Sequence, residues 1–267
     1  MQLDVPEPRL FAPTPPQPHL RPLVLVPGLD GTGKLFCPQV ARLAQHFDVR
    51  CVHIPTENRQ DWETLARATL AAVEAEYPHQ QVYLCGESFG ACLALKMASL
   101  APRKMTRLVV INSASAMRSQ PLLRWVTQIA PEVPDWLFRS ASPVACSLLA
   151  AFDRMLPQQQ QHFIETVRHI PQACVTWRLS MLHQFALTPA EHRTLTMPTL
   201  AIASARDRLL PSLQEAEWLR IHLPQCTTYI LPNSGHVCLL ESAIDLTQCL
   251  AQTDFLPTPS KTWLMRR

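Results

Sequence analysis

The chain has 267 residues, of which 47% are hydrophobic and 17% charged, so it can bury a large core and is not globally disordered. Its net charge of +3 is small and dispersed, which argues against a nucleic-acid-binding protein. Nine cysteines are scattered singly, without a Cys-x-x-Cys pair, and no apolar run approaches the roughly 18 residues that span a bilayer.

Cysteines of this kind behave as small hydrophobic residues and suit a reducing compartment rather than a disulfide framework. The first 21 residues are proline-rich and have no apolar segment typical of a secretory signal. We therefore expect a soluble, cytoplasmic protein, and leave a peripheral membrane contact open.

Residues 1–22 contain seven prolines, so we expect an extended N-terminal arm rather than a helix or a paired strand. After the arm, four short apolar runs predict strands, at residues 23–26, 49–54, 81–85 and 107–113. Apolar residues at helical spacing predict helices between them, at residues 34–47, 62–77 and 91–98. This alternation predicts an α/β fold with a mostly parallel sheet and helices on both faces.

The alternation stops at residues 116–187, where several helical patterns follow one another without a strand, and we predict a helical cap insertion there. Four aromatic residues of this segment either line an acyl pocket or simply pack the cap on the core: Trp125, Trp136, Phe138 and Phe152. Residues 23–115 and 188–253 then form the predicted core, and residues 254–267 a C-terminal tail.

The second part of the core has two predicted strands, at residues 199–203 and 227–231, and two predicted helices, at residues 212–223 and 237–250. Capping-box patterns open helices at Thr188 and Ser212.

The pattern Gly-x-Ser-x-Gly stands at residues 86–90, between a predicted strand and a predicted helix. This arrangement is typical of a nucleophile elbow, a sharp turn that presents a serine hydroxyl at the top of a sheet. A Cβ atom on Gly86 or Gly90 would collide with the neighbouring strand or helix. All six glycines lie in three candidate loops, at residues 28–33, 86–90 and 235. The predicted nucleophile is Ser88.

A nucleophilic serine needs a base, and the base needs an acid that orients it. Asp207 follows the predicted strand 199–203, and His236 follows the last predicted strand, in the chain order serine, acid, histidine. An acid after strand 107–113 is the alternative, but that place holds Asn112 and Ser113. The other interpretations are an Asp207 surface ion pair with a neighbouring arginine and a structural, buried His236.

An oxyanion site needs two backbone N–H groups close to the nucleophile. We predict that Leu29, in the loop after the first strand, and Phe89, next to the nucleophile, supply them. Gly28, Gly31 and Gly235 support these loops by letting the backbone turn or come close. The spacing of residues 28–34 does not match a phosphate-binding Walker motif, and Asp30 with Thr32 is expected to hold the turn.

Four segments together resemble the α/β-hydrolase family, in particular its esterase, lipase and thioesterase branch typified by plastid phytyl ester synthases. These segments are residues 27–33, 86–90, 207–212 and 234–236, and the similarity extends over residues 23–250. The resemblance implies an α/β-hydrolase fold, Ser88, Asp207 and His236 as the triad, and acyl groups on lipid-like alcohols or thiols as substrates. The plant enzymes also carry an acyltransferase-like domain with a His-x-x-x-x-Asp motif, which this sequence lacks.

We therefore expect a serine hydrolase that acts on a small-molecule ester or thioester with a hydrophobic, lipid-like acyl group. An acyltransferase that passes the acyl group to a long-chain alcohol is the main alternative. A cofactor-free lyase or C–C hydrolase, or a non-catalytic binding protein on the same fold, is a further one. Neither a metal nor an organic cofactor is expected.

Overall fold

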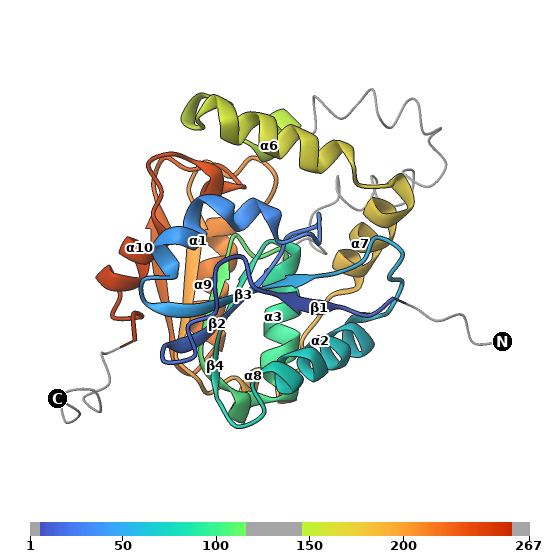
Figure 1. Cartoon of the computed structure of the whole chain (residues 1–267), viewed down its shortest axis with the longest axis vertical. Helices are drawn as coiled ribbons and strands as arrows, with labels where there is room; N and C mark the ends of the chain where they lie inside the picture. The colour runs from blue at the N-terminus through green and yellow to red at the C-terminus, as the bar shows by residue number, and fades with distance from the viewer. Residues whose placement is uncertain (1–5, 116–145, 258–267) are drawn as a thin grey trace.

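A seven-stranded sheet with the strand order β1-β3-β2-β4-β5-β6-β7 forms the centre of the molecule (Figure 1). The computed structural model describes residues 6–115 and 146–257. The strands are β1 Arg9–Phe11, β2 Arg21–Val26, β3 Phe47–His53, β4 Val82–Glu87, β5 Met105–Ile111, β6 Thr199–Ser204 and β7 Cys226–Leu231. All neighbouring strands are parallel except β1, which runs antiparallel to β3. The predicted mostly parallel sheet is confirmed.

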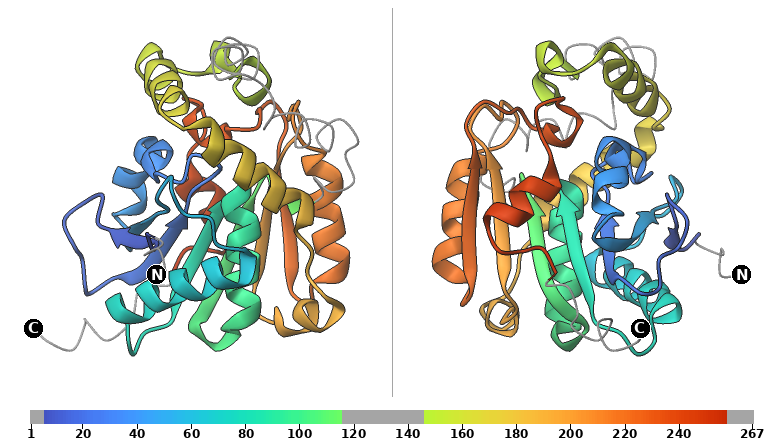
Figure 2. Two further views of the ribbon diagram at one scale, coloured as in Figure 1. Left: turned by 90° about the vertical axis from the view of Figure 1, so that its right-hand side faces the viewer. Right: turned by 60° about the vertical axis from the view of Figure 1, so that its left-hand side comes forward.

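Helices cover both faces of this sheet, and each face has its own hydrophobic cluster. The helices α2 Trp62–Glu76, α3 Phe89–Leu100, α8 Pro189–Thr194 and α9 Ser212–His222 lie on one face, and α1 Cys37–Leu43 and α10 Leu246–Gln252 on the other (Figure 2). We call the cluster under α2, α3 and α9 the first hydrophobic cluster and the one under α1 and α10 the second. Successive residues of β2 point to opposite faces, since Val24 belongs to the first cluster and Leu25 to the second. The central strands are therefore apolar on both faces, which explains their uninterrupted apolar runs.

The N-terminal arm contains a paired strand, so the prediction of an unpaired extended segment is wrong. Arg9 lies opposite His53 and Phe11 opposite Cys51, and this antiparallel ladder closes one edge of the sheet. Pro8 and Pro13 flank the strand rather than interrupt it. An edge strand needs hydrogen bonds on one side only, so prolines at its ends are tolerated.

Two predicted helices are shorter than expected. The first is a 3-10 turn, Lys34–Phe36, followed by α1, and Phe47 already belongs to the next strand. The predicted helix at residues 237–250 is a 3-10 turn, Cys238–Leu240, and then α10, which begins where Asp245 accepts from the N–H of Thr247. Between them Glu241 is extended, and its buried carboxylate binds Gly235 and Arg154 instead of continuing a helix.

The described part of the predicted cap, residues 146–187, is helical and contains no strand. It consists of a helical turn at residues 146–149, a 3-10 turn Phe152–Arg154, α6 Pro157–Arg168 and α7 Gln172–Gln184. α6 lies over the end of the sheet, and α7 runs back along the face that carries α2 and α3 (Figure 2). Phe152 packs edge-on against Phe163, with ring centroids 6.0 Å apart, which is ordinary cap packing. Trp125, Trp136 and Phe138 lie outside the described residues.

At the other end of the chain, Phe255 is only 4% exposed and packs into the second hydrophobic cluster, under the guanidinium of Arg107. The packed core thus extends beyond residue 253. None of the helices in the described parts of the chain is both long and apolar enough to cross a membrane.

Candidate active site

Ser88 occupies a strained turn between β4 and α3, as the elbow pattern predicts. Its backbone angles are φ 56° and ψ −116°, a region that few residues other than glycine adopt. A Cβ atom on Gly86 would overlap the backbone of Gly90, and one on Gly90 would overlap the carbonyl groups of Val26 and Pro27. Both glycines are therefore required for steric reasons, because strand, turn and loop come into direct backbone contact here.

The structure brings Ser88, His236 and Asp207 together at the carboxyl ends of the strands. The Nε2 atom of His236 lies 2.9 Å from the Oγ atom of Ser88, and its Nδ1 atom lies 2.8 Å from Oδ2 of Asp207. The His236 and Asp207 side chains are 2% and 1% exposed. These three side chains come from the loops after β4, β6 and β7 and form one continuous hydrogen-bonded chain.

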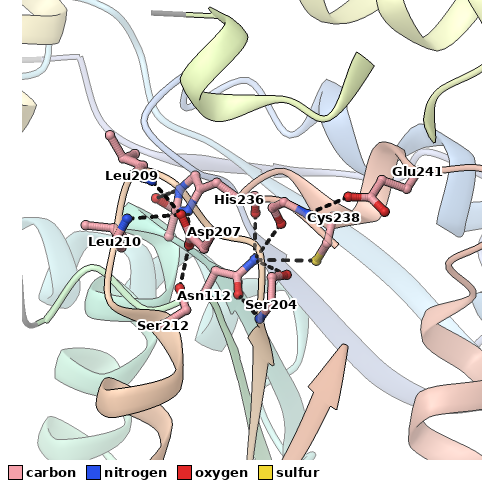
Figure 3. A network of polar contacts seen from close by, with 11 residues as sticks. Asn112, Ser204, Asp207, Leu209, Leu210, Ser212, His236, Cys238 and Glu241 are labelled. Carbon is pink, nitrogen blue, oxygen red and sulfur yellow. Dashed lines mark hydrogen bonds and ion pairs between the residues drawn. The ribbon is translucent and has the colours of Figure 1, made fainter. Parts of the chain in front are cut away.

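The Asp207 carboxylate is surrounded by donors. Oδ1 accepts from the backbone N–H groups of Leu209 and Leu210, at 2.9 and 3.0 Å, and Oδ2 accepts from the hydroxyl of Ser212 (Figure 3). Burial opposes ionisation, but the neighbouring His236 and these donors outweigh it and hold the pKa of Asp207 below its usual range. Asp207 is thus a buried, ionised carboxylate fixed in orientation, and no arginine of the described residues forms an ion pair with it.

Ser212 has a different role from the one predicted for it. The capping-box pattern at residues 212–215 is wrong, because Pro211 is the N-cap residue of α9 and makes no side-chain cap bond. The hydroxyl of Ser212 donates to Asp207, and Glu215 accepts from the hydroxyl of Ser115. Both side chains therefore bind partners outside their helix, and that of Ser212 binds a residue of the site. By contrast, the capping box at Thr188 is confirmed.

Asn112 joins the ends of three neighbouring segments. Its Oδ1 atom accepts from the N–H of Ser204 at 2.8 Å, and its Nδ2 atom donates to the Ser204 hydroxyl at 2.9 Å and to the His236 carbonyl at 2.6 Å (Figure 3). The residue is 1% exposed and adopts a φ of 45°. Sequence reasoning considered Asn112 only because no acid stands there. Its side chain in fact ties the loop that carries His236 to β5 and β6.

The loop after β2 passes beside the elbow. A Cβ atom on Gly28 would lie 3.9 Å from the Cβ of Ser88, and the N–H of Gly31 donates to the Gly28 carbonyl at 3.0 Å. Asp30 accepts from the N–H and the hydroxyl of Thr32, which confirms that these two residues hold the turn. Leu29 and Phe89 therefore lie on the two backbone segments next to Ser88, and their role as oxyanion donors stays a prediction. At the first position of α3, the N–H of Phe89 has no acceptor within its helix.

The glycines of the site differ in whether a Cβ atom would fit at their positions. Gly31 has a φ of +70°, and a Cβ atom there would overlap the guanidinium of Arg178. At Gly28 and Gly235, a Cβ atom would make only contacts of 3.4 Å or more, so neither position is closed to a side chain by sterics. Gly235 instead contributes its N–H, which donates to Glu241 at 2.7 Å.

Sequence reasoning did not single out Glu87 and Arg178, two buried ionisable side chains next to the site. Glu87 is 5% exposed, and its Oε1 atom has no hydrogen-bond partner among the described residues. Burial, and then the negative charges of Asp30 and Asp207, raise the pKa of Glu87 to about 8. Its position inside the Gly-x-Ser-x-Gly pattern was the signal available in the sequence. Among the described residues, no cluster of three His, Cys, Asp or Glu side chains is arranged to hold a metal ion.

Comparison with known proteins defines the family to which this chain and its fold belong. Residues 21–243 match the family described as the alpha/beta hydrolase fold, and this range is most of the chain. The chain therefore belongs to the alpha/beta hydrolase family. An enol-lactonase from Burkholderia xenovorans shares the fold, with a TM-score of 0.73, 17% sequence identity, and coverage of 93% of this chain and 95% of the other. The predicted fold class is confirmed.

Within this family, the chain is similar to two chloroplastic proteins of Arabidopsis thaliana. Phytyl ester synthase 1 is 30% identical over 95% of this chain and 42% of its own length, and phytyl ester synthase 2 is 28% identical over 93% and 40%. The chain thus spans about two fifths of the length of these relatives. The predicted resemblance to phytyl ester synthases is confirmed.

Proposed function

We propose that this protein is a serine hydrolase that cleaves an ester or thioester with a hydrophobic acyl group. The observation that carries the proposal is the hydrogen-bonded chain from Ser88 through His236 to Asp207, at the carboxyl ends of a parallel sheet. The similarity to phytyl ester synthases supports an acyl substrate of lipid-like character. Contact of the protein with a membrane surface stays a prediction.

The mechanism follows from the direction of the hydrogen bonds. An ionised carboxylate can only accept, so the proposed tautomer of His236 carries its proton on Nδ1, donates it to Asp207 and turns the lone pair of Nε2 to the Ser88 hydroxyl. As Ser88 Oγ attacks the acyl carbonyl carbon, Nε2 takes its proton, and the carbonyl oxygen becomes an oxyanion. The N–H groups of Leu29 and Phe89 are the proposed donors to that oxyanion.

Collapse of this tetrahedral intermediate breaks the bond to the leaving group. His236 passes the proton to the departing alcohol or thiol, and the acyl group stays on Ser88 as an ester. A water molecule then attacks the acyl-enzyme, with His236 as its base, and releases the acid and free Ser88. Asp207 keeps its charge throughout and stabilises the imidazolium that forms twice in each cycle.

Acyl transfer is the second candidate function, and the similarity to phytyl ester synthase 1 favours it. The first half of the reaction is the same in both cases. In the second half a long-chain alcohol replaces water, gives its proton to His236 and leaves as a new ester. The two functions therefore differ only in the molecule that resolves the acyl-enzyme.

A panel of p-nitrophenyl esters of increasing chain length, with and without a long-chain alcohol, tests both candidates. We expect turnover by the wild type, and a fall in kcat/KM of about 10⁴-fold or more in Ser88→Ala. Ser99→Ala is the matched control, because it removes a buried serine hydroxyl from the far end of the same helix. Its kcat/KM should stay close to the wild-type value.

A new ester of the added alcohol would identify a transferase, and free acid alone a hydrolase. Turnover that persists in Ser88→Ala would contradict both functions. A wild type that binds these esters without cleaving them would instead indicate a binding protein.

A further inference from the structure

Arg178, on α7, is a buried cation that binds backbone carbonyl groups. The residue is 2% exposed. The charge of Asp30 attracts it, but among the described residues no carboxylate lies close enough to form an ion pair with it. Its Nη1 atom donates to the carbonyl of Leu29 at 2.7 Å, and Nη2 donates to the carbonyls of Ile54 and Pro55 at 3.0 and 3.1 Å. Burying a guanidinium costs free energy because the charge loses its hydration, and no ion pair offsets that cost here. A buried arginine at this position therefore indicates a specific role.

This side chain contacts the backbone of one segment of the proposed oxyanion site and lies over the aromatic ring of the other. It binds Leu29 directly, and its Cζ atom lies 5.9 Å from the centre of the Phe89 ring. The loop packs so closely on the guanidinium that a Cβ atom on Gly31 would overlap it. Leu29 and Phe89 are the residues whose N–H groups are proposed to bind the oxyanion, so one side chain meets both residues, at the Leu29 carbonyl and at the Phe89 ring.

A second contact ties the same helix to the Phe89 side. The Trp62 ring lies 4.8 Å from the Phe89 ring, centre to centre, and the Nε1 atom of Trp62 donates to the carbonyl of Met181 at 2.7 Å. Met181 is one turn after Arg178 on α7. α7 is therefore connected to the Leu29 loop through Arg178 and to Phe89 through both Arg178 and Trp62.

We propose that Arg178 is a positioning residue that sets the Leu29 and Phe89 N–H groups in place for the oxyanion, an inference that rests on the proposed function. Its hydrogen bond to the Leu29 carbonyl stops the loop from rotating about that residue, so the donors are in place before substrate binds. Donors of this kind contribute to the rate only when they are fixed in advance at the right distance. α7 is accordingly part of the catalytic framework and not only a cover over it.

Arg178→Met and Arg178→Lys test this proposal, with Arg50→Met as the matched control. Arg50 is also buried, at 6% exposure, but it pairs with Asp48 and Glu76 on β3 and α2. Titration of Ser88 with a fluorophosphonate counts the active sites of each variant, so kcat is expressed per intact site. KM and the affinity for a boronic acid that forms a tetrahedral adduct with serine are measured beside it.

We expect Arg178→Met to lower kcat per titrated site by about 10- to 100-fold, with KM within about threefold of the wild type. Affinity for the boronic acid should fall in parallel with kcat. Arg178→Lys should recover part of the loss, because one ammonium can bind the Leu29 carbonyl but cannot reproduce the guanidinium fork. Arg50→Met should lower thermal stability and leave kcat per titrated site unchanged.

A kcat per site within twofold of the wild type in Arg178→Met would overturn the proposal, and so would a rise in KM alone, which indicates substrate binding. Should Arg178→Met not fold, the same limits apply to Arg178→Lys. The rate at which the fluorophosphonate labels Ser88 needs no substrate, so equal rates in wild type and variants overturn the role of Arg178 even without ester turnover. An unreactive Ser88 in the wild type overturns this proposal together with the proposed function.

Discussion

Three carboxyl groups lie close to the proposed nucleophile, and their surroundings give them different charges. Asp207 has several hydrogen-bond donors, which hold its pKa below the usual range against the effect of burial. Burial raises the pKa of Asp30, against the opposing bonds from Thr32. Glu87 has the least compensation, and its pKa of about 8 makes it neutral at pH 7. Asp207 is thus charged because hydrogen-bond donors stabilise its carboxylate. Glu87 is protonated because it is buried and its Oε1 atom has no hydrogen-bond partner among the described residues.

The protonated state of Glu87 predicts a pH-dependent stability. Its pKa is about 8 in the folded protein against 4.5 for the unperturbed group, so between these values the folded state holds a proton that the unfolded state has released. The contribution of Glu87 to the free energy of unfolding is therefore fully present below pH 4.5. About 3–5 kcal/mol of it is lost as the pH rises to about 8.

Glu87→Gln keeps the shape and removes the titration. We expect its free energy of unfolding, relative to the wild type, to rise steadily between pH 4.5 and 8 and to level off above. Urea denaturation at pH 5, 6.5 and 8 measures the difference. Glu63→Gln, which removes an exposed carboxylate from α2, serves as the control. A constant difference between Glu87→Gln and the wild type would show that Glu87 is ionised in the folded protein.

At the scale of single elements, the elbow and the loop after β2 predict opposite responses to the same change. In Gly90→Ala the new methyl group would overlap the carbonyls of Val26 and Pro27, which are backbone atoms and cannot move aside. We expect a loss of at least about 3 kcal/mol in unfolding free energy, or failure to fold. In Gly28→Ala the nearest contact is 3.7 Å and φ is not positive, so stability should stay within about 1 kcal/mol of the wild type.

Thermal melts of the two variants, side by side, test this contrast. A stable Gly90→Ala protein would show that the elbow can relax, and a strongly destabilised Gly28→Ala protein would show that the loop is tighter than its contacts indicate.

The elements that sequence analysis predicted correctly are those whose signals are local. The elbow needs a strand, two spaced glycines and a helix, and all of these lie within one short stretch of chain. β1 was missed because a three-residue strand gains its stability from β3, about forty residues later, which no local pattern reveals. The break at Glu241 was missed for a similar reason, since the contacts that cause it involve Arg154 and Gly235.

The same reasoning separates the parts of the candidate site. Ser88, Asp207 and His236 each follow a predicted strand, and parallel strands bring their carboxyl ends to one edge of the sheet. Arg178 lies 149 residues from Leu29 along the chain, inside a helix with ordinary spacing. Nothing in its neighbourhood indicates where its side chain goes. Ser212 was noticed as a helix cap, and only the fold shows that its hydroxyl is directed to Asp207 instead.

At the scale of the whole molecule, the solvent exposure of the nine cysteines shows how tightly the chain is packed. None of the nine is in a disulfide, seven are buried, Cys226 is half-buried and Cys37 is exposed. Burial raises the pKa of Cys51 to about 12 and that of Cys249 to about 11, so these thiols are unreactive at neutral pH.

Ellman's reagent should therefore modify one thiol rapidly in the native protein, Cys226 more slowly, and all nine only in denaturant. Cys37→Ser should remove the rapid phase and leave the rest unchanged. Fewer than nine thiols in denaturant, without added reductant, would reveal a disulfide and contradict the structure, in which none of the nine cysteines forms one.

Asn112 has a consequence for any attempt to move this chemistry onto another scaffold. Its amide binds both Ser204, at the end of β6, and the segment that bears His236. The end of β5 therefore fixes the distance between these two segments. Grafting Asp207 and His236 with their own loops would carry over these two side chains but leave behind Asn112, whose hydrogen bonds fix the distance between the two loops. A successful transplant has to include the end of β5, although that strand contributes no reacting atom.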